Sequence, residues 1–188
     1  MRRRQSLLPT IWLMTDERMG ERLWEALERL PRGSGVILRH YSLPIGERRA
    51  LFAKVARVAR RRRLILLRAG EGPLGPEEHG VHGRTARRTR PGLRTMPVHS
   101  RTEAITAVRR GADALFVSPV FATRSHPGAR ALGPVRLGLM IAGLDVPVIA
   151  LGGMDARRAR ALRVPGLYGW AAIDAWSAAD QKRKAVPT

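Results

Sequence analysis

The sequence predicts an α/β fold, a compact (β/α)8 TIM barrel whose third and fourth βα units are shortened or degenerate. Short apolar, β-branched runs alternate with segments of helical spacing, which is the pattern of repeated βα units. Eight such runs occur in 188 residues, and a barrel of this kind ordinarily needs about 200 residues or more, so its helices must be trimmed. We expect one domain over residues 1–188, with flexible basic tails at 1–8 and 180–188.

The predicted strands are short apolar runs that are bounded by turn residues or charges. In chain order they are Ile11–Thr15, Gly35–Arg39, Leu64–Leu67, Gly80–His82, Arg94–Val98, Ala114–Ser118, Val146–Leu151 and Leu167–Ile173. The carboxyl ends of parallel strands meet at one rim of a barrel, and ligands bind at that rim. The residues that close each strand are therefore the candidate functional residues.

Segments with helical spacing separate most of these strands. They are Gly20–Leu30, Ile45–Arg62, Arg101–Arg110, Pro134–Ala142, Asp155–Leu162 and a last one near Ala175–Arg183. Ser100 or Thr102 can cap the third of these helices, and Asp155 can cap the fifth. The stretch 70–78 is rich in Gly and Pro, which predicts a loop where a regular barrel has its third helix.

The chain carries a formal net charge of +20 with a pI near 11.9, a balance that is typical of nucleic-acid-binding proteins. All 35 basic residues except Lys54, Lys182 and Lys184 are Arg, which indicates a compositional preference spread over the surface. The four Trp, two Tyr and three Phe form no stripe interleaved with Arg for base stacking. Solvated basic helix faces are the simpler interpretation, and non-specific attraction to polyanions follows from the charge alone.

Cysteine is absent, which excludes thiol catalysis, disulfides and thiolate metal sites. The longest apolar runs, such as 146–151, are too short to cross a bilayer, and the basic start of the chain has no signal-type apolar segment after it. We therefore expect a cytoplasmic protein without a membrane partner. The sequence leaves the oligomeric state open, and a homo-oligomer is compatible with it.

Two loops after predicted strands carry groups that suit a phosphate. Gly152 and Gly153 follow a buried strand and precede a helix cap, so their N–H groups can approach an anion closely, although a tight turn needs the same glycines. The loop after the sixth strand offers the hydroxyls of Thr123 and Ser125 and the imidazole of His126. A solvent loop made basic by composition is the alternative there.

Seven segments carry motifs that occur together, in this order, in one known family. They are WLMTDERMG (12–20), GVILRHY (35–41), HGVHG (79–83), PVHSRTEA (97–104), GADALFVSPVFAT (111–123), VPVIALGGM (146–154) and GLYGWAAIDAW (166–176). The chain thereby resembles thiamine-phosphate synthase and its relative thiazole tautomerase, which have motifs such as DGVHLG, SVHSxxEA, GADYxxxGPxFxT and PVVAIGGI. The resemblance covers nearly the whole chain and implies a (β/α)8 barrel.

The resemblance implies an enzyme that joins an aminopyrimidine diphosphate to a thiazole phosphate, with magnesium assisting the loss of pyrophosphate. This chain departs from the family in the part of the site that would bind magnesium and pyrophosphate. Leu67 stands where the family's INDR motif has a metal-binding Asp, and the stretch 83–90 holds no acid for a second ligand. Of the family's Gln-x-Arg-x-Lys set only Arg39 remains. The sequence therefore predicts no metal site and no certain cofactor, magnesium included.

The half that resembles the thiazole-phosphate site is better kept. The residues expected to bind a phosphate or substrate there are Thr123, Ser125, His126, Gly152, Gly153, Ile173 and Asp174. His126 replaces the family's Lys and is only partly charged near neutral pH. Asp174 replaces the Ser that ends the last strand, and its carboxylate repels a phosphate, whereas the backbone donors beside it are unaffected by that change.

Thiazole tautomerases also lack the metal carboxylates, and they use a His after the sixth strand where this chain has Pro119. The remaining candidates for catalysis are Arg39, His82 and His99, although a structural or solvated His is the simpler interpretation. Three functions stay open. The chain is either a transferase or isomerase of thiamine biosynthesis, an inactive or regulatory barrel that binds a small phosphate, or a basic surface for polyanions.

Overall fold

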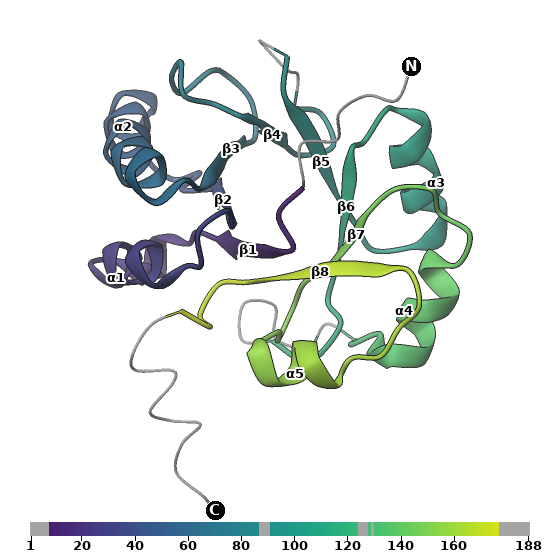
Figure 1. Ribbon diagram of the computed structural model, residues 1–188. Helices are drawn as coiled ribbons and strands as arrows, with labels where there is room; N and C mark the ends of the chain where they lie inside the picture. The colour runs from purple at the N-terminus through teal and green to yellow at the C-terminus, as the bar shows by residue number, and fades with distance from the viewer. Residues whose placement is uncertain (1–7, 87–90, 124–127, 129, 177–188) are drawn as a thin grey trace, which may run out of the picture.

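The computed structural model describes residues 8–86, 91–123, 128 and 130–176, which form a closed barrel of eight parallel strands in sequential order (Figure 1). The strands are β1 (Ile11–Met14), β2 (Gly35–Leu38), β3 (Ile65–Ala69), β4 (Gly80–His82), β5 (Leu93–Val98), β6 (Ala114–Val117), β7 (Val148–Ala150) and β8 (Leu167–Ala172). Closure comes from β8, which pairs in parallel with both β7 and β1. The predicted fold class and its eight strands are confirmed.

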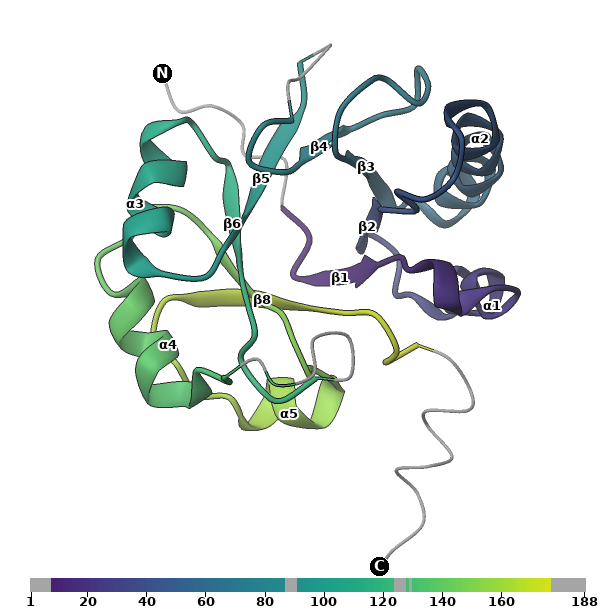
Figure 2. The same ribbon diagram turned by 180° about the vertical axis from the view of Figure 1, so that it is seen from behind.

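Helices cover the outside of the barrel on two sides, as the two opposite views show (Figures 1 and 2). They are the 3-10 turn η1 (Glu17–Met19) and the helices α1 (Arg22–Arg29), α2 (Ile45–Arg62), α3 (Arg101–Arg109), α4 (Gly133–Ile141) and α5 (Ala156–Ala161). Within the described residues, none follows β3 or β4, so the third and fourth units are degenerate as predicted. The predicted helix near Ala175–Arg183 lies outside the described residues, apart from a turn at 175–176.

Three predicted boundaries are wrong by two residues, among them the end of the third strand, which runs to Ala69 rather than Leu67. The first helix begins at Arg22 rather than Gly20, because Asp16 caps η1 and Gly20 ends it at φ 49°, a left-handed conformation that favours glycine. The seventh strand, predicted as Val146–Leu151, is only Val148–Ala150, because only these three residues pair with both β6 and β8. Of the two candidate caps of α3, Ser100 is the one that accepts a hydrogen bond, from the amide of Glu103.

The apolar core has three parts. One lies between β1–β3 and the helices α1 and α2, and a second lies between β5–β8 and the helices α3 to α5. The third fills the barrel interior, where Trp12 is fully buried and meets Phe116 edge to face at 5.4 Å between ring centroids. A Cβ atom at Gly35 would lie 2.0 Å from the Trp12 ring, so this glycine makes room for the indole.

A cavity of about 520 Å³ opens between α2 and the segment 76–79. Its lining includes small and apolar residues of α2 and β3, among them Ala56, Ala59 and Leu66. A regular unit would place its helix after β3, whereas the described chain there is a loop. Across the described residues, no helix is long and apolar enough to span a membrane.

Candidate functional site

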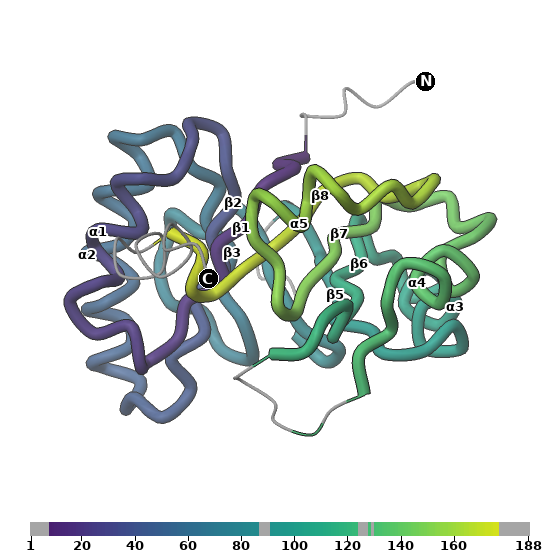
Figure 3. The backbone as a smooth tube through the Cα atoms, turned by 90° about the horizontal axis from the view of Figure 1, so that it is seen from below, coloured from purple at the N-terminus to yellow at the C-terminus, as the bar shows by residue number. Residues whose placement is uncertain are grey.

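The rim at the carboxyl ends of the strands divides into two parts, which Figure 3 shows on opposite sides of the barrel. We call residues 8–86 the β1–β4 half and residues 91–176 the β5–β8 half. The catalytic candidates Arg39 and His82 belong to the first, and His99 belongs to the second. The predicted phosphate-binding residues all lie in the second half, although Ser125 and His126 fall outside the described residues.

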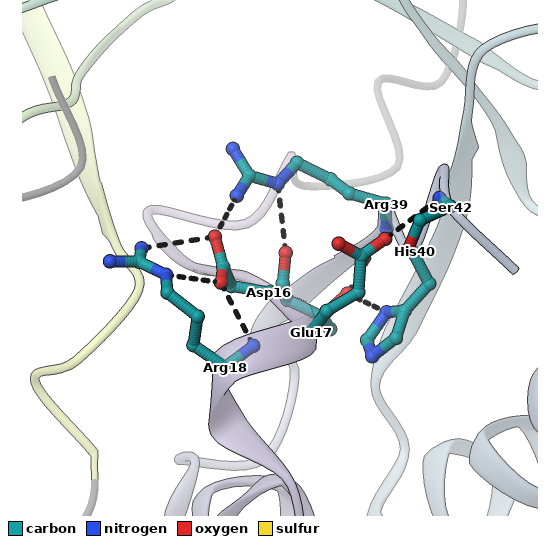
Figure 4. A network of polar contacts seen from close by, with 7 residues as sticks. Asp16, Glu17, Arg18, Arg39, His40 and Ser42 are labelled. Carbon is teal, nitrogen blue, oxygen red and sulfur yellow. Dashed lines mark hydrogen bonds and ion pairs between the residues drawn. The ribbon is translucent and has the colours of Figure 1, made fainter.

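Arg39 follows β2 and is held by the chain segment that follows β1 (Figure 4). Its Nη2 lies 2.5 Å from Oδ2 of Asp16, and its Nε donates to the carbonyl of Thr15 at 2.8 Å. Asp16 also accepts from Nε of Arg18 at 2.7 Å. This hydrogen bond to Arg18, with the nearby charge of Arg39, lowers the pKa of Asp16 to about 2, so the carboxylate is ionised.

Polar contacts continue along the same edge of the rim. Oγ1 of Thr15 accepts from the amide of Arg39 and lies 3.0 Å from Nδ1 of His40. Burial lowers the pKa of His40, which favours the neutral imidazole. The amide of Ser42 donates to Glu17 at 2.9 Å, and this contact lowers the pKa of the Glu17 carboxyl. The polar groups of this edge bind mostly to one another.

Two further arginines of the β1–β4 half are buried. Arg68 on β3 is 1% exposed, and its Nε lies 2.9 Å from the carboxylate of Glu78. Arg48 on α2 donates to the carbonyl of Ala69 at 2.6 Å and stacks on the ring of Tyr41. Both guanidinium groups thus have acceptors within the chain itself.

The position where the family has a metal-binding Asp does not suit a magnesium ion. Leu67 is fully buried among the apolar side chains of the barrel interior. No group of three or more acidic or imidazole side chains with metal-binding geometry occurs among the described residues. Magnesium prefers several oxygen ligands, and the nearby Asp16 carboxylate is already shared by two arginines. The residues present do not fit the magnesium site that the family resemblance implies.

His82 lies inside the barrel, with only 4% of the residue exposed. Its Nδ1 lies 2.9 Å from Oγ1 of Thr95, and its ring meets Phe116 edge to face at 5.0 Å. Burial, with the nearby charge of Arg39, lowers the pKa of His82 to about 3. The imidazole is therefore neutral at physiological pH and packed in the core.

His99 closes β5 and is exposed. Its Nδ1 lies 2.8 Å from the carbonyl of Ser118, the residue that closes β6. A carbonyl only accepts, so Nδ1 carries a proton, and in the neutral tautomer Nε2 is the acceptor atom. The amide of His99 donates to Glu103, whose own amide donates to Ser100, so the start of α3 fixes this histidine. His99 thus contacts Ser118, the residue before Pro119, which is the position where the resemblance places the histidine of thiazole tautomerases.

The turn after β7 has two glycines in the left-handed region, Gly152 at φ 93° and Gly153 at φ 61°. A Cβ atom at Gly152 would lie 2.7 Å from Cα of Pro119, and one at Gly153 would lie 2.5 Å from the carbonyl of Ala122. The turn is therefore pressed against the loop after β6. Neither glycine amide donates to a protein acceptor within the described chain.

A cation stands beside this glycine turn. Nη1 of Arg158 donates to the carbonyl of Gly153, and its guanidinium stacks on the ring of Phe121 at 5.0 Å. Asp155 accepts from the amide of Arg158 and so begins α5, as predicted. Backbone donors and a fixed positive charge thus occur together at the end of β7.

The remaining predicted phosphate-binding residues are half-buried at the same end of the barrel. Thr123 lies in the loop after β6, and Ile173 and Asp174 follow β8. The hydrogen bond to Asp16 is the main cause that raises the pKa of Arg18, and the charge of Asp174 adds a smaller effect in the same direction, so Asp174 lies near this residue of the β1–β4 half. The negative charge of Asp174 was expected to disfavour a phosphate. In the structure, Asp174 lies at the rim, where this charge would act on a bound phosphate.

Sequence reasoning did not identify the pairs of Arg39 with Asp16 and of Arg68 with Glu78. Asp16 directly follows a predicted strand, so its place at the rim was a usable signal. Glu78 lies in a loop, ten residues from its partner, and no spacing rule connects the two. The position of Arg158 over the glycine turn also has no sequence signature.

The family model described as thiamine monophosphate synthase matches residues 87–176. "Putative thiamine-phosphate synthase 2" of Aquifex aeolicus is 30% identical over 179 residues, which are 88% of this chain and 96% of that protein. The thiamine-phosphate synthase of Pyrococcus furiosus is 34% identical over 114 residues, 60% of this chain and 54% of its own length.

Among solved structures, the thiamine phosphate pyrophosphorylase from Pyrococcus furiosus matches with a TM-score of 0.78. The match covers 95% of this chain and 91% of the other, at 24% sequence identity. At that identity the likeness shows the fold alone, and it agrees with the closed barrel described above.

Proposed function

The chain belongs to the thiamine-phosphate synthase family, and from this premise we propose that it binds a thiazole phosphate or a similar small phosphate at its β5–β8 half. The observation that carries the proposal is the glycine turn after β7. Among the described residues, no acceptor binds the amides of Gly152 and Gly153, which lie beside the guanidinium of Arg158. Oriented backbone N–H groups next to a fixed cation are a suitable receptor for a phosphate.

The β1–β4 half supports a different conclusion about the metal-dependent transfer. That reaction requires carboxylates for magnesium and free cations for pyrophosphate. Here Leu67 lies in the apolar interior, and Arg39 is paired with Asp16. We therefore expect no thiamine phosphate when the purified protein is incubated with both precursors and magnesium, measured by fluorescence after oxidation. Product formation at catalytic enzyme concentration would refute this part of the proposal.

Binding of the phosphate can be tested by calorimetry with thiazole phosphate, and in parallel with inorganic phosphate. Substitution of either glycine would disturb the packing of the turn, so we favour a charge variant. Asp174→Asn removes a negative charge from the rim, and we expect it to tighten binding about three- to tenfold. Asp145→Asn is the matched control, because Asp145 is exposed and precedes β7 at the opposite end of the barrel.

Equal affinities of Asp174→Asn and Asp145→Asn would place the phosphate away from the end of β8. Absence of any binding of thiazole phosphate at millimolar concentration would remove the proposed function itself.

A second candidate, an isomerase similar to thiazole tautomerase, is favoured by His99. Its Nδ1 is engaged by the carbonyl of Ser118, so Nε2 is free to take and return a proton. We expect His99→Gln to abolish isomerisation of a thiazole phosphate tautomer while the dissociation constant of the product changes less than about threefold. Loss of binding in the same proportion would assign His99 to binding only, and unchanged turnover would exclude it from the reaction.

A further inference from the structure

The cavity of about 520 Å³ beside α2 lies away from the rim that holds the candidate site. Leu64 and His79, which directly precede β3 and β4, both line it, so it lies towards the amino ends of these strands. A regular barrel has a helix after β3, whereas Figure 2 shows a loop there, next to α2. The volume is in the range of pockets that hold a small molecule, about 300–1,000 Å³.

Small and apolar residues form much of the lining. Ala56 and Ala59 lie three residues apart on α2, and Leu64 and Leu66 line the cavity from the start of β3. All four residues are buried, and the alanine side chains end at Cβ, which leaves the space beyond them open. Water in an apolar cavity has few hydrogen-bond partners, so the apolar part of a ligand is favoured there.

Two cations of the same lining come from the end of α2. They are Arg60 and Arg63, and neither guanidinium has a hydrogen bond or an ion pair within the part of the chain that the structure describes. The amide of Leu64 donates to the carbonyl of Ala59 at 2.8 Å, so the backbone closes the end of the helix without these side chains. Both guanidinium groups can therefore serve a ligand.

The two carboxylates of the lining do not cancel this charge. Glu78 is engaged elsewhere, because its Oε2 lies 2.9 Å from Nε of the buried Arg68. Glu77 is exposed, and its Oε2 lies 3.2 Å from the place that a Cβ atom of Gly75 would take, so it is close to the loop itself. Two cations without partners thus stand against one carboxylate.

His79 adds a hydrogen-bond donor. The amide of Leu66 donates to its Nδ1 at 3.2 Å, so the ring proton lies on Nε2. Cationic and N–H donors beside an apolar lining fit an anionic group that is joined to an apolar chain. A second copy of this chain is a poorer occupant, because each copy carries a net charge of +20 and the two repel each other.

We infer that this cavity is a binding site for a small amphipathic anion, a carboxylate joined to a short aliphatic chain. The carboxylate binds to Arg60 and Arg63, and the chain packs against Ala56, Ala59 and Leu66. The site shares no residue with the glycine turn after β7, so it does not rest on the proposed function.

Titration calorimetry with octanoate tests the site against two matched ligands. Octanol has the same chain without the charge, and acetate has the charge without the chain. We expect octanoate to bind at least about tenfold more tightly than either, since the apolar lining and the cations both contribute.

The charge variant combines Arg60→Gln with Arg63→Asn, because asparagine tolerates the left-handed backbone at residue 63, φ 56°. We expect it to bind octanoate about tenfold more weakly than the wild type. The control combines Lys54→Gln with Arg57→Gln, which removes the same charge from exposed positions of α2 outside the lining. The control should bind octanoate as the wild type does.

The filling variant Ala59→Leu extends a side chain into the cavity, and we expect it to weaken octanoate binding more than about tenfold. Ala53→Leu is its control, at an exposed position of the same helix outside the lining. If Ala59→Leu does not fold, the charge variant and its control decide the question.

Four results would overturn the inference. Absence of octanoate binding at millimolar concentration would remove the site, and equal binding of octanol would leave an apolar surface without an anion site. Equal weakening in the control Lys54→Gln with Arg57→Gln would reduce the effect to net charge. A wild-type dimer in sedimentation that Ala59→Leu dissociates would assign the cavity to a second copy. Thiazole phosphate binding is measured separately, so failure of the proposed function remains a distinct outcome.

Discussion

The two halves of the rim differ in how their polar groups are satisfied. In the β1–β4 half, the guanidinium groups of Arg39 and Arg68 each have a carboxylate partner within the chain. In the β5–β8 half, the amides of Gly152 and Gly153 have no acceptor in the described protein, and the exposed imidazole of His99 contacts Ser118 through Nδ1. A polar residue at a barrel rim thus indicates a ligand-binding site only where some of its donors or acceptors have no partner within the protein.

The largest expected effect tests whether the β1–β4 arginines are structural. Glu78→Gln leaves Arg68 buried without its counter-charge, and we expect the free energy of unfolding to fall by about 3–5 kcal/mol in urea titrations. Glu77→Gln changes an exposed neighbour and should stay within about 0.5 kcal/mol of the wild type. A similar small loss for Glu78→Gln would break the contrast between the two halves.

The glycine turn of the β5–β8 half gives the second effect. We expect Gly152→Ala to destabilise the protein by about 2–4 kcal/mol, because a left-handed backbone and a contact with Pro119 both oppose a Cβ atom. Gly143→Ala is the matched control, since Gly143 also has a positive φ but open space around it, and should cost about 1–2 kcal/mol. Equal losses in thermal unfolding would mean that packing against the loop contributes nothing.

A third effect depends on pH and concerns His82. Its folded-state pKa is about 3, against an ordinary value of 6.5, so only the unfolded chain takes up this proton between those values. Stability should therefore be complete above pH 6.5 and fall on acidification, by about 2 kcal/mol between pH 7 and 5. The pKa of His40 is lowered in the same direction, so the comparison with His82→Asn isolates the contribution of His82.

Urea midpoints measured at both pH values in the two proteins would check this. Asp16 does not contribute in that interval, because a carboxyl with a lowered pKa loses its stabilising effect only as pH falls from about 4 towards 2. An equally steep pH dependence in His82→Asn would show that His82 titrates normally.

The smallest expected effect tests how far burial determines the contribution of an ion pair to stability. Arg61 also pairs with a glutamate, Glu28, but both side chains are well exposed, at 63% and 46%. We expect Arg61→Gln to change the free energy of unfolding by less than about 1 kcal/mol, and 1 M salt to abolish the difference. A loss as large as that of Glu78→Gln would mean that solvent exposure does not separate the two ion pairs.

Much of the fold could be predicted because its cause is local. The run at β2 and the Gly-Pro-rich stretch 70–78 specify a buried strand and a loop by composition alone, and Ser100 marks the start of α3. The order of the strands follows from the alternation of strands and helices, since parallel units close in sequence. These features can be predicted without knowing which side chains are in contact.

The site could be predicted only as far as each residue's place at a strand end. Arg39 was expected at the rim and lies there, but its occupation by Asp16 depends on how β1 and β2 are aligned in space. His82 closes its strand as expected, yet its side chain turns inward to Thr95, which strand periodicity could suggest but not decide. Hydrogen-bond partners across strands are set by register, and register is not written in any single segment.

The barrel interior also constrains how this sequence can change over time. The indole of Trp12 occupies the volume that any side chain at residue 35 would need, and its N–H is bound to the carbonyl of Pro9. A larger residue than Gly35 is therefore tolerated only if Trp12 has first been replaced by a smaller residue. A smaller residue in place of Trp12 leaves a void until Gly35 is replaced by a larger one. The two positions, on neighbouring strands, should be inherited as a pair, with single replacements rare among descendants and paired replacements the rule.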